Sequence, residues 1–137
     1  GSGAMAVEAL SRGARSAVCV DSSPAAIAAM TRNRVILDDA TSLEIWRSDW
    51  RGALRRAERA RRVFGLCLLD PPYSLLPRIA GELAASLVPV LQVGATIVVE
   101  SAASHGPVEI AGLSTASRTD RTYGSTSISI IRTGEPE

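Results

Sequence analysis

The residues with the clearest potential for chemistry are Asp70-Pro71-Pro72-Tyr73, which follow directly on an apolar run at residues 64–69. A run of this length and content predicts a buried strand, so the tetrapeptide stands where a strand leaves a sheet. Two consecutive prolines donate no backbone N–H, so carboxylate and carbonyl oxygens dominate this exit. Such a site favours a ligand with two N–H donors, and Tyr73 offers a flat face to its ring. The tetrapeptide therefore predicts a site for an aromatic amine, such as the exocyclic amino group of a nucleobase.

A second set of residues has the spacing of a nucleotide-binding pocket. Gly1-Ser2-Gly3-Ala4-Met5-Ala6 has the form G-x-G-x-x-A and opens a predicted helix, whose N-terminus favours acceptor groups. Asp21 ends the next predicted strand, where a carboxylate can accept hydrogen bonds from both hydroxyls of a ribose. Asp49 ends a third strand and could receive an adenine amino group, with Trp50 or its neighbours against the ring. Together these residues predict a pocket for an adenosine-containing cofactor.

Each of these signals also has a simpler explanation. A glycine turn can be only a tight turn, residues 1–5 could be left over from an expression tag, and Asp49 could merely cap the following helix. A dinucleotide fingerprint fits the first two signals equally well, so an NAD-dependent oxidoreductase is the rival hypothesis. Hydride transfer has no evident use for Asp-Pro-Pro-Tyr, however, and no His or Lys is well placed for a proton relay. Methyl transfer to an aromatic amine uses all of these residues.

Length and composition narrow the class of protein. With 137 residues, 46% of them apolar, the chain predicts one compact domain over residues 1–137. Cys19 and Cys67 lie in apolar runs, which favours free thiols in a reducing cytoplasm. His105 is the only histidine, so a His-based triad or a zinc cluster lacks its parts and we expect no metal. No apolar stretch has the length of a membrane span, and nothing resembles a signal peptide.

All fifteen basic residues are arginines, and seven of them cluster within sixteen residues. They are Arg47, Arg51, Arg55, Arg56, Arg59, Arg61 and Arg62. The simpler interpretation is a solvated helix face with Glu58 among its partners. Contact with nucleic-acid phosphates is the alternative.

Helical and strand-like segments alternate along most of the chain. The pattern predicts helices near residues 4–11, 25–35, 50–61 and 76–91, the last of them interrupted near Pro89. It predicts strands near residues 17–20, 43–49, 64–69 and 94–100. This order predicts an α/β doubly wound, mostly parallel sheet covered on both faces. Residues 108–117 and 125–132 alternate apolar and small polar side chains around a connection at 119–124, which predicts an antiparallel pair at one edge.

With these motifs in order, the chain resembles the class I S-adenosylmethionine-dependent amino-methyltransferases that carry a [DN]-P-P-[YF] motif. More narrowly, it resembles the bacterial small-subunit ribosomal RNA guanine-N2 methyltransferases. The resemblance covers nearly the whole chain through residues 1–14, Val20-Asp21, Ser48-Asp49, Asp70-Pro71-Pro72-Tyr73, Val99-Glu100-Ser101 and Tyr123-Gly124-Ser125-Thr126.

The resemblance implies a class I methyltransferase (Rossmann-like) fold and methyl transfer from S-adenosylmethionine to the N2 amino group of a guanine, leaving S-adenosylhomocysteine. Its implied partner is ribosomal RNA or the 30S subunit, and we expect a cytoplasmic monomer. The catalytic residues carried over are Asp70, Pro71, Pro72 and Tyr73. The cofactor-binding residues carried over are Gly1, Ser2, Gly3, Ala4, Asp21, Ser22, Asp49 and Trp50.

One departure from the family pattern stands out. Family members have a strand immediately before the glycine turn, whereas this chain starts at the turn itself. We therefore expect an incomplete copy of the domain, with a gap between the strands that end at Asp21 and Asp70. The remaining alternatives are amino-methylation of adenine N6 or cytosine N4 in DNA, the NAD-binding oxidoreductase, and a catalytically silent fragment that binds RNA through its arginine face.

Overall fold

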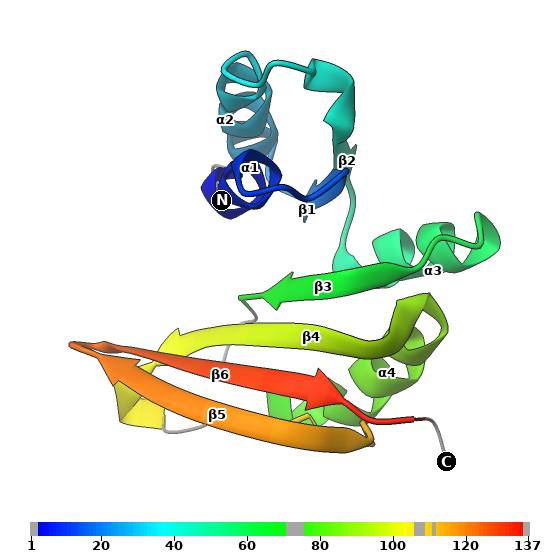
Figure 1. Cartoon of the computed structure of the whole chain (residues 1–137), viewed down its shortest axis with the longest axis vertical. Coiled ribbons are helices and arrows are strands. Elements are labelled where there is room, and N and C mark those ends of the chain that lie inside the picture. Colours follow the sequence, from blue (N-terminus) through cyan, green and yellow to red (C-terminus); the bar gives the residue numbers. More distant parts are fainter. Residues whose placement is uncertain (1–2, 71–75, 106–108, 111, 136–137) are drawn as a thin grey trace. The chain divides into compact units, whose positions relative to one another are not determined.

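The computed structural model describes residues 3–70, 76–105, 109–110 and 112–135 (Figure 1). The chain divides into two compact units, Gly1–Ala53 and Leu54–Glu137.

The first unit is a parallel pair of strands packed with helices. Its elements are α1 (Ala4–Ser11), β1 (Ala17–Asp21), α2 (Pro24–Arg34), the 3-10 helix η1 (Ala40–Ser42) and β2 (Leu43–Arg47). The strands β1 and β2 run parallel, from the pair Ala17 and Leu43 to the pair Asp21 and Arg47. Because parallel neighbours need a crossover connection, α2 lies between them in the chain.

Local chemistry sets the helix boundaries in this unit. Ser23 caps α2, where its hydroxyl accepts a hydrogen bond from the Ala26 N–H at 3.4 Å, and Pro24 occupies the first position without leaving an unpaired donor.

The core of the first unit consists of Cys19, Met30 and Leu43. The partly buried side chains that pack against it are Ala6, Val7, Leu10, Ala17, Ile27, Leu37 and Ile45. Burial of these apolar side chains holds the helices on the strand pair.

The second unit contains a four-stranded mixed sheet. Helix α3 (Trp50–Arg59) leads into it, and the remaining elements are β3 (Phe64–Leu69), α4 (Leu76–Leu87), η2 (Val88–Val90), β4 (Leu91–Ala102), η3 (Ala103–His105), β5 (Thr115–Tyr123) and β6 (Thr126–Thr133). The strand order is β3-β4-β6-β5. The pair β3 and β4 is parallel, whereas β6 runs antiparallel to both β4 and β5.

The core of the second unit lies on one face of this sheet. Alternate residues of β4 are buried, with Ile97 and Val99 fully so, and Ile97 pairs with the buried Ile131 of β6. Four residues at helical spacing on α4 are also buried, namely Ala80, Leu83, Ala84 and Leu87. This spacing gives α4 one apolar stripe, which covers the buried face of the sheet (Figure 1).

The alternating order of helices and strands and the antiparallel C-terminal pair are confirmed. The strands form two sheets in the described part of the chain, with β1-β2 in one and β3-β4-β6-β5 in the other. In the described residues β1 and β3 therefore belong to different sheets, and the gap expected between the strands that end at Asp21 and Asp70 stays a prediction.

The boundaries of the C-terminal pair required correction. The first strand of the pair was predicted at residues 108–117 and its connection at 119–124, but β5 spans Thr115–Tyr123 and only a tight turn separates it from β6. Almost every residue of β5 is exposed, as expected for an edge strand. Polar residues on both faces remove the alternation that marks a half-buried strand, so this segment resembled a loop. Residues 106–108 and 111 lie outside the described part of the chain.

Candidate functional site

Gly3 precedes α1 in a backbone conformation that favours glycine. Its φ is +78°, and a Cβ at this position would lie 3.2 Å from Cγ of Met30 and 3.6 Å from Sγ of Cys19. A side chain would therefore cost both backbone strain and a close contact. Ala4, the first residue of α1, is exposed, and a helix N-terminus favours acceptor groups. Gly1 and Ser2 lie outside the described residues.

Asp21 stands at the end of β1 with its carboxylate half-exposed. The Ser23 N–H donates to Oδ1 of Asp21 at 2.8 Å, and this hydrogen bond is the main reason that the pKa of Asp21 is lowered. A carboxylate has about four acceptor positions, and the Ser23 N–H occupies one of them. Ser22, beside it, is exposed. The position and ionisation of Asp21 thus suit the hydroxyls of a ribose.

Asp49 is exposed and caps α3, because its Oδ1 accepts a hydrogen bond from the Gly52 N–H at 2.7 Å. The simpler explanation of this residue, a helix cap, is therefore confirmed. The same loop is joined to the loop after β1, since the Ser48 N–H donates to the backbone oxygen of Asp21 at 3.0 Å. Asp21 and Asp49 consequently follow neighbouring strands at one edge of the β1-β2 pair.

Trp50 is half-buried, and its indole ring already has a partner. The guanidinium carbon of Arg51 lies 4.4 Å from the ring centroid, which is the geometry of a cation–π contact. The predicted stacking of adenine on Trp50 would therefore have to use ring surface that Arg51 does not cover.

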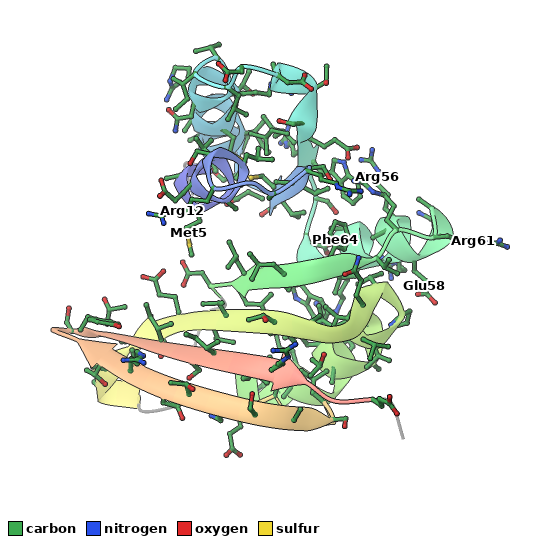
Figure 2. All side chains as sticks on the ribbon, viewed as in Figure 1. Met5, Arg12, Arg56, Glu58, Arg61 and Phe64 are labelled. Atoms are coloured by element: carbon green, nitrogen blue, oxygen red, sulfur yellow. The ribbon has the colours of Figure 1, made fainter. Side chains whose placement is uncertain are left out.

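The arginine cluster presents several exposed guanidinium groups. Arg55, Arg56, Arg59 and Arg61 are exposed, and Figure 2 shows Arg61 and Glu58 pointing away from α3 and the turn after it. Arg62 instead lies over the ring of Phe64, at 5.6 Å from the centroid. The exposed members fit both a solvated helix face and a contact with phosphates, and phosphate binding stays a prediction.

Asp70 follows β3 directly and is exposed. Because β3 runs parallel to β4, with Leu69 opposite Val99, the carboxyl ends of the two strands meet at one edge of the sheet. Burial raises the pKa of the nearby Cys67 thiol to about 11, which keeps this thiol protonated near neutral pH. Pro71, Pro72 and Tyr73 lie outside the described residues.

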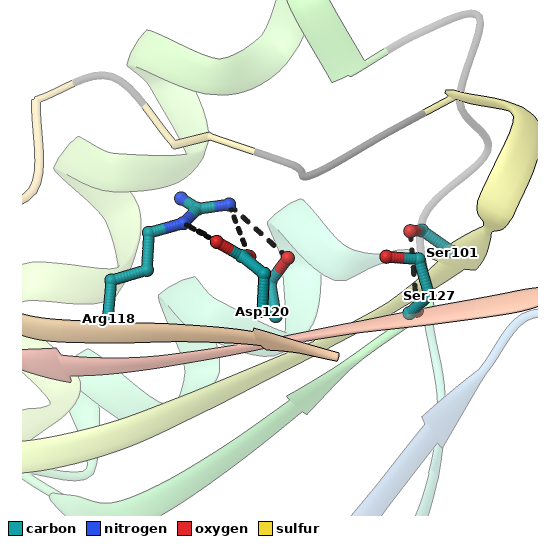
Figure 3. Close-up of polar contacts among 5 residues, drawn as sticks. Ser101, Arg118, Asp120 and Ser127 are labelled. Atoms are coloured by element: carbon teal, nitrogen blue, oxygen red, sulfur yellow. Dashed lines mark hydrogen bonds and ion pairs between the residues drawn. The ribbon is translucent and has the colours of Figure 1, made fainter. Parts of the chain in front are cut away.

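Two further elements reach the edge that carries Asp70. The Ser101 hydroxyl at the end of β4 donates to the backbone oxygen of Ser127 on β6 at 3.3 Å (Figure 3). The Ala103 N–H donates to the backbone oxygen of Ser125 in the β5-β6 turn at 2.8 Å. Residues 99–101 and 123–126 belong to the family resemblance, but no local pattern in the sequence predicts a role for them, because their position at the same end of the sheet as Asp70 depends on strand pairing.

Other parts of the described chain carry less chemistry. A hollow of about 580 Å³ lies at the opposite end of the sheet, between the start of β4 and the end of β6, and no charged side chain lines it. Among the described residues, no group of three or more His, Cys, Asp or Glu side chains is arranged to hold a metal ion. No helix in the described ranges combines the length and apolar character needed to cross a membrane.

Comparison with solved structures defines the class of fold. A conserved hypothetical protein from Streptococcus pyogenes is 28% identical, with a TM-score of 0.75, and the alignment covers 97% of this chain and 81% of that one. The Escherichia coli protein yhhF, described as a candidate methyltransferase, is 23% identical with a TM-score of 0.75, covering 99% and 74%. The methyltransferase candidate SMU.776, solved with S-adenosylhomocysteine, is 13% identical with a TM-score of 0.74, covering 96% and 42%.

The chain thus has a class I methyltransferase fold. It belongs to the family described as Conserved hypothetical protein 95, whose model matches residues 1–132. None of the curated proteins compared with the chain matches it significantly.

Proposed function

We propose that this protein transfers a methyl group from S-adenosylmethionine to the exocyclic N2 amino group of a guanine in small-subunit ribosomal RNA. The observation that carries the proposal is the exposed Asp70 carboxylate at the carboxyl end of β3, in the sequence Asp70-Pro71-Pro72-Tyr73. Ligands of open α/β sheets bind at this edge of their strands. The methyltransferase fold and the family membership support the class of reaction.

The first unit offers the residues that would hold the cofactor. Gly3 leaves the N-terminus of α1 open to the methionine end, Asp21 can accept both ribose hydroxyls, and the loop at Asp49 can receive the adenine amino group. The S-adenosylhomocysteine bound to SMU.776 supports this choice of cofactor. When bound, S-adenosylmethionine supplies an activated methyl group on a sulfonium.

Asp70 and Pro71 would act on the amine. The lone pair of an arylamine is delocalised into the ring, which makes the nitrogen a poor nucleophile. If the Asp70 carboxylate and the Pro71 carbonyl accept hydrogen bonds from its two N–H groups, the nitrogen becomes more pyramidal and the positive charge that develops on it is stabilised. Transfer would form an N–C bond at this nitrogen and break the S–C bond of the sulfonium, and the proton that the nitrogen then loses would pass to the Asp70 carboxylate.

The substrate must reach this pocket as an accessible base. A guanine in a stacked helix cannot present its amino group to a strand end, so the reaction favours a looped or flipped nucleotide. The exposed arginines around α3 support a nucleic-acid partner by their charge. Two free cysteines, Cys19 and Cys67, agree with a cytoplasmic location.

A calorimetric titration tests the proposed class of cofactor. S-adenosylhomocysteine is expected to bind the protein with one site, and NAD is expected to give no heat of binding at the same concentrations. Binding of NAD without binding of S-adenosylhomocysteine would replace the proposal with the oxidoreductase alternative. If neither ligand binds but RNA does, the protein is an RNA-binding fragment without methyltransferase activity.

A further inference from the structure

Tyr123 is an exposed aromatic residue at the edge of the sheet that carries Asp70. It is 58% exposed, at the end of β5. Tyr123 pairs with Thr126 of β6, and Thr126 pairs with Ala102 of β4. Ala102 lies three residues after Val99, the residue of β4 that pairs with Leu69. The strand register therefore places Tyr123 at the same edge as Asp70.

The turn that presents Tyr123 is held in place by the backbone. Gly124 has φ of +60°, which a tight β5-β6 turn requires and glycine adopts without strain. The Ala103 N–H donates to the Ser125 oxygen at 2.8 Å and fastens the turn to the end of β4. The aromatic ring is therefore carried on a preorganised element, which lowers the entropic cost of using it as a contact.

Two arginines on β5 differ in what they contact. Arg118 lies on the α4 face of the sheet and forms an ion pair with Asp120 at 3.0 Å, while its Nη2 also donates to the Ser129 hydroxyl at 3.2 Å (Figure 3). Successive side chains of a strand point to opposite faces of the sheet, so Arg121, three residues after Arg118 on β5, lies on the other face. Tyr123, two residues after Arg121, lies on the same face as Arg121. Arg121 is exposed. An exposed aromatic ring and an exposed guanidinium thus share one face of the edge strand.

We infer that Tyr123 and Arg121 contact the substrate RNA beside the target base, with Tyr123 stacking on a neighbouring unpaired base and Arg121 contacting a phosphate. This inference rests on the proposed function. Three strand spacings of about 4.8 Å separate β3 from β5, so Tyr123 lies roughly 14 Å across the sheet from the strand of Asp70. That separation is too large for one base to contact both residues. Tyr123 therefore selects for single-stranded RNA next to the reacting guanine.

The test measures binding of a fluorescent single-stranded RNA oligonucleotide by anisotropy. Tyr123→Ala is expected to weaken binding about 5- to 150-fold, the range for loss of one base–aromatic stack, whereas Tyr123→Phe keeps the wild-type affinity. Arg121→Ala is expected to reduce the slope of log affinity against log salt by about one, and Tyr123→Ala to leave it unchanged. Val93→Ala is the matched control, because Val93 is exposed near the opposite end of β4.

The outcomes separate this inference from the proposed function. Affinity of Tyr123→Ala for RNA equal to that of the wild type overturns the inference, even if the wild type methylates RNA. A wild type that binds no oligonucleotide also overturns it. If Tyr123→Ala loses RNA affinity but the wild type methylates no RNA, the inference stands and the proposed function fails. Unchanged affinity for S-adenosylhomocysteine in every variant confirms that the cofactor pocket is intact.

Discussion

Asp70→Ala is expected to lower kcat for methyl transfer by about 10² to 10³, which corresponds to about 2.7–4 kcal/mol of lost transition-state stabilisation. The reason is that positive charge develops on the amine nitrogen only as the N–C bond forms. A fixed carboxylate at the end of β3 interacts more strongly with that charge than with the neutral amine of the bound substrate. The loss should therefore fall on kcat, with a smaller change in KM.

The design of this experiment separates chemistry from binding. Steady-state rates are measured with saturating S-adenosylmethionine, and the affinity for S-adenosylhomocysteine is measured in parallel. Asp38→Ala serves as a control, because Asp38 is an exposed carboxylate in the connection after α2 and has no proposed role. Methyl transfer by Asp70→Ala at close to the wild-type rate would remove Asp70 from the mechanism.

Asp21→Ala is expected to weaken binding of S-adenosylhomocysteine about 10- to 150-fold, the loss for removing a charged hydrogen-bond acceptor worth about 1.5–3 kcal/mol. The ribose hydroxyls would lose their acceptor at the end of β1, while Asp70 and the acceptor site stay unchanged. At saturating cofactor, kcat should therefore stay near the wild-type value.

Asp39→Ala is the matched control for Asp21→Ala. Oδ1 of Asp39 accepts a hydrogen bond from the Thr41 N–H at 3.0 Å, just as Oδ1 of Asp21 accepts one from Ser23 two residues on. Both carboxyl groups have a lowered pKa. If cofactor affinity fell only because such a turn was lost, it would fall in both variants. If a ligand contact is lost, cofactor affinity falls only in Asp21→Ala. Equal cofactor affinity in the two variants would exclude Asp21 from the pocket.

The pH dependence follows from the direction of the Asp21 shift. Its pKa is lowered in the folded protein, mainly by the Ser23 N–H, so the carboxylate stays ionised below the ordinary range of an aspartate. Its contribution to folding is present above the unfolded pKa of about 3.9 and is lost as the pH falls through the lowered value. Cofactor affinity that depends on Asp21 is therefore expected to stay constant between about pH 7 and pH 5.

Elements with strong local signals were predictable from the sequence. The apolar run at residues 64–69 became β3 with the predicted bounds, and Ala4–Ser11 became α1, because a glycine stands before it and another glycine follows it. Helix α2 begins at Pro24, one residue before the predicted start, because Ser23 caps it by local chemistry. Such features depend on a few neighbouring residues, so they need no knowledge of the tertiary structure.

Features that depend on pairing or packing were not predictable in the same way. Strand β5 was displaced in the prediction because its exposed edge position leaves no apolar alternation to detect. The contact of Arg51 with the Trp50 ring depends on the conformations of both side chains, and sequence alone left that ring available to adenine. The place of Tyr123 beside Asp70 follows from the register of three strand pairs, which no local pattern encodes.

Identification of the methylated nucleoside tests the central proposal most directly. The protein and isotopically labelled S-adenosylmethionine are incubated in three parallel reactions, with unmethylated 30S subunits, with naked small-subunit ribosomal RNA and with DNA. Each product is then digested to nucleosides for mass spectrometry. The proposal predicts labelled N2-methylguanosine from the ribosomal substrates and none from DNA. Label on adenine N6 or cytosine N4 of DNA, or an absence of labelled nucleoside from every substrate, would contradict it.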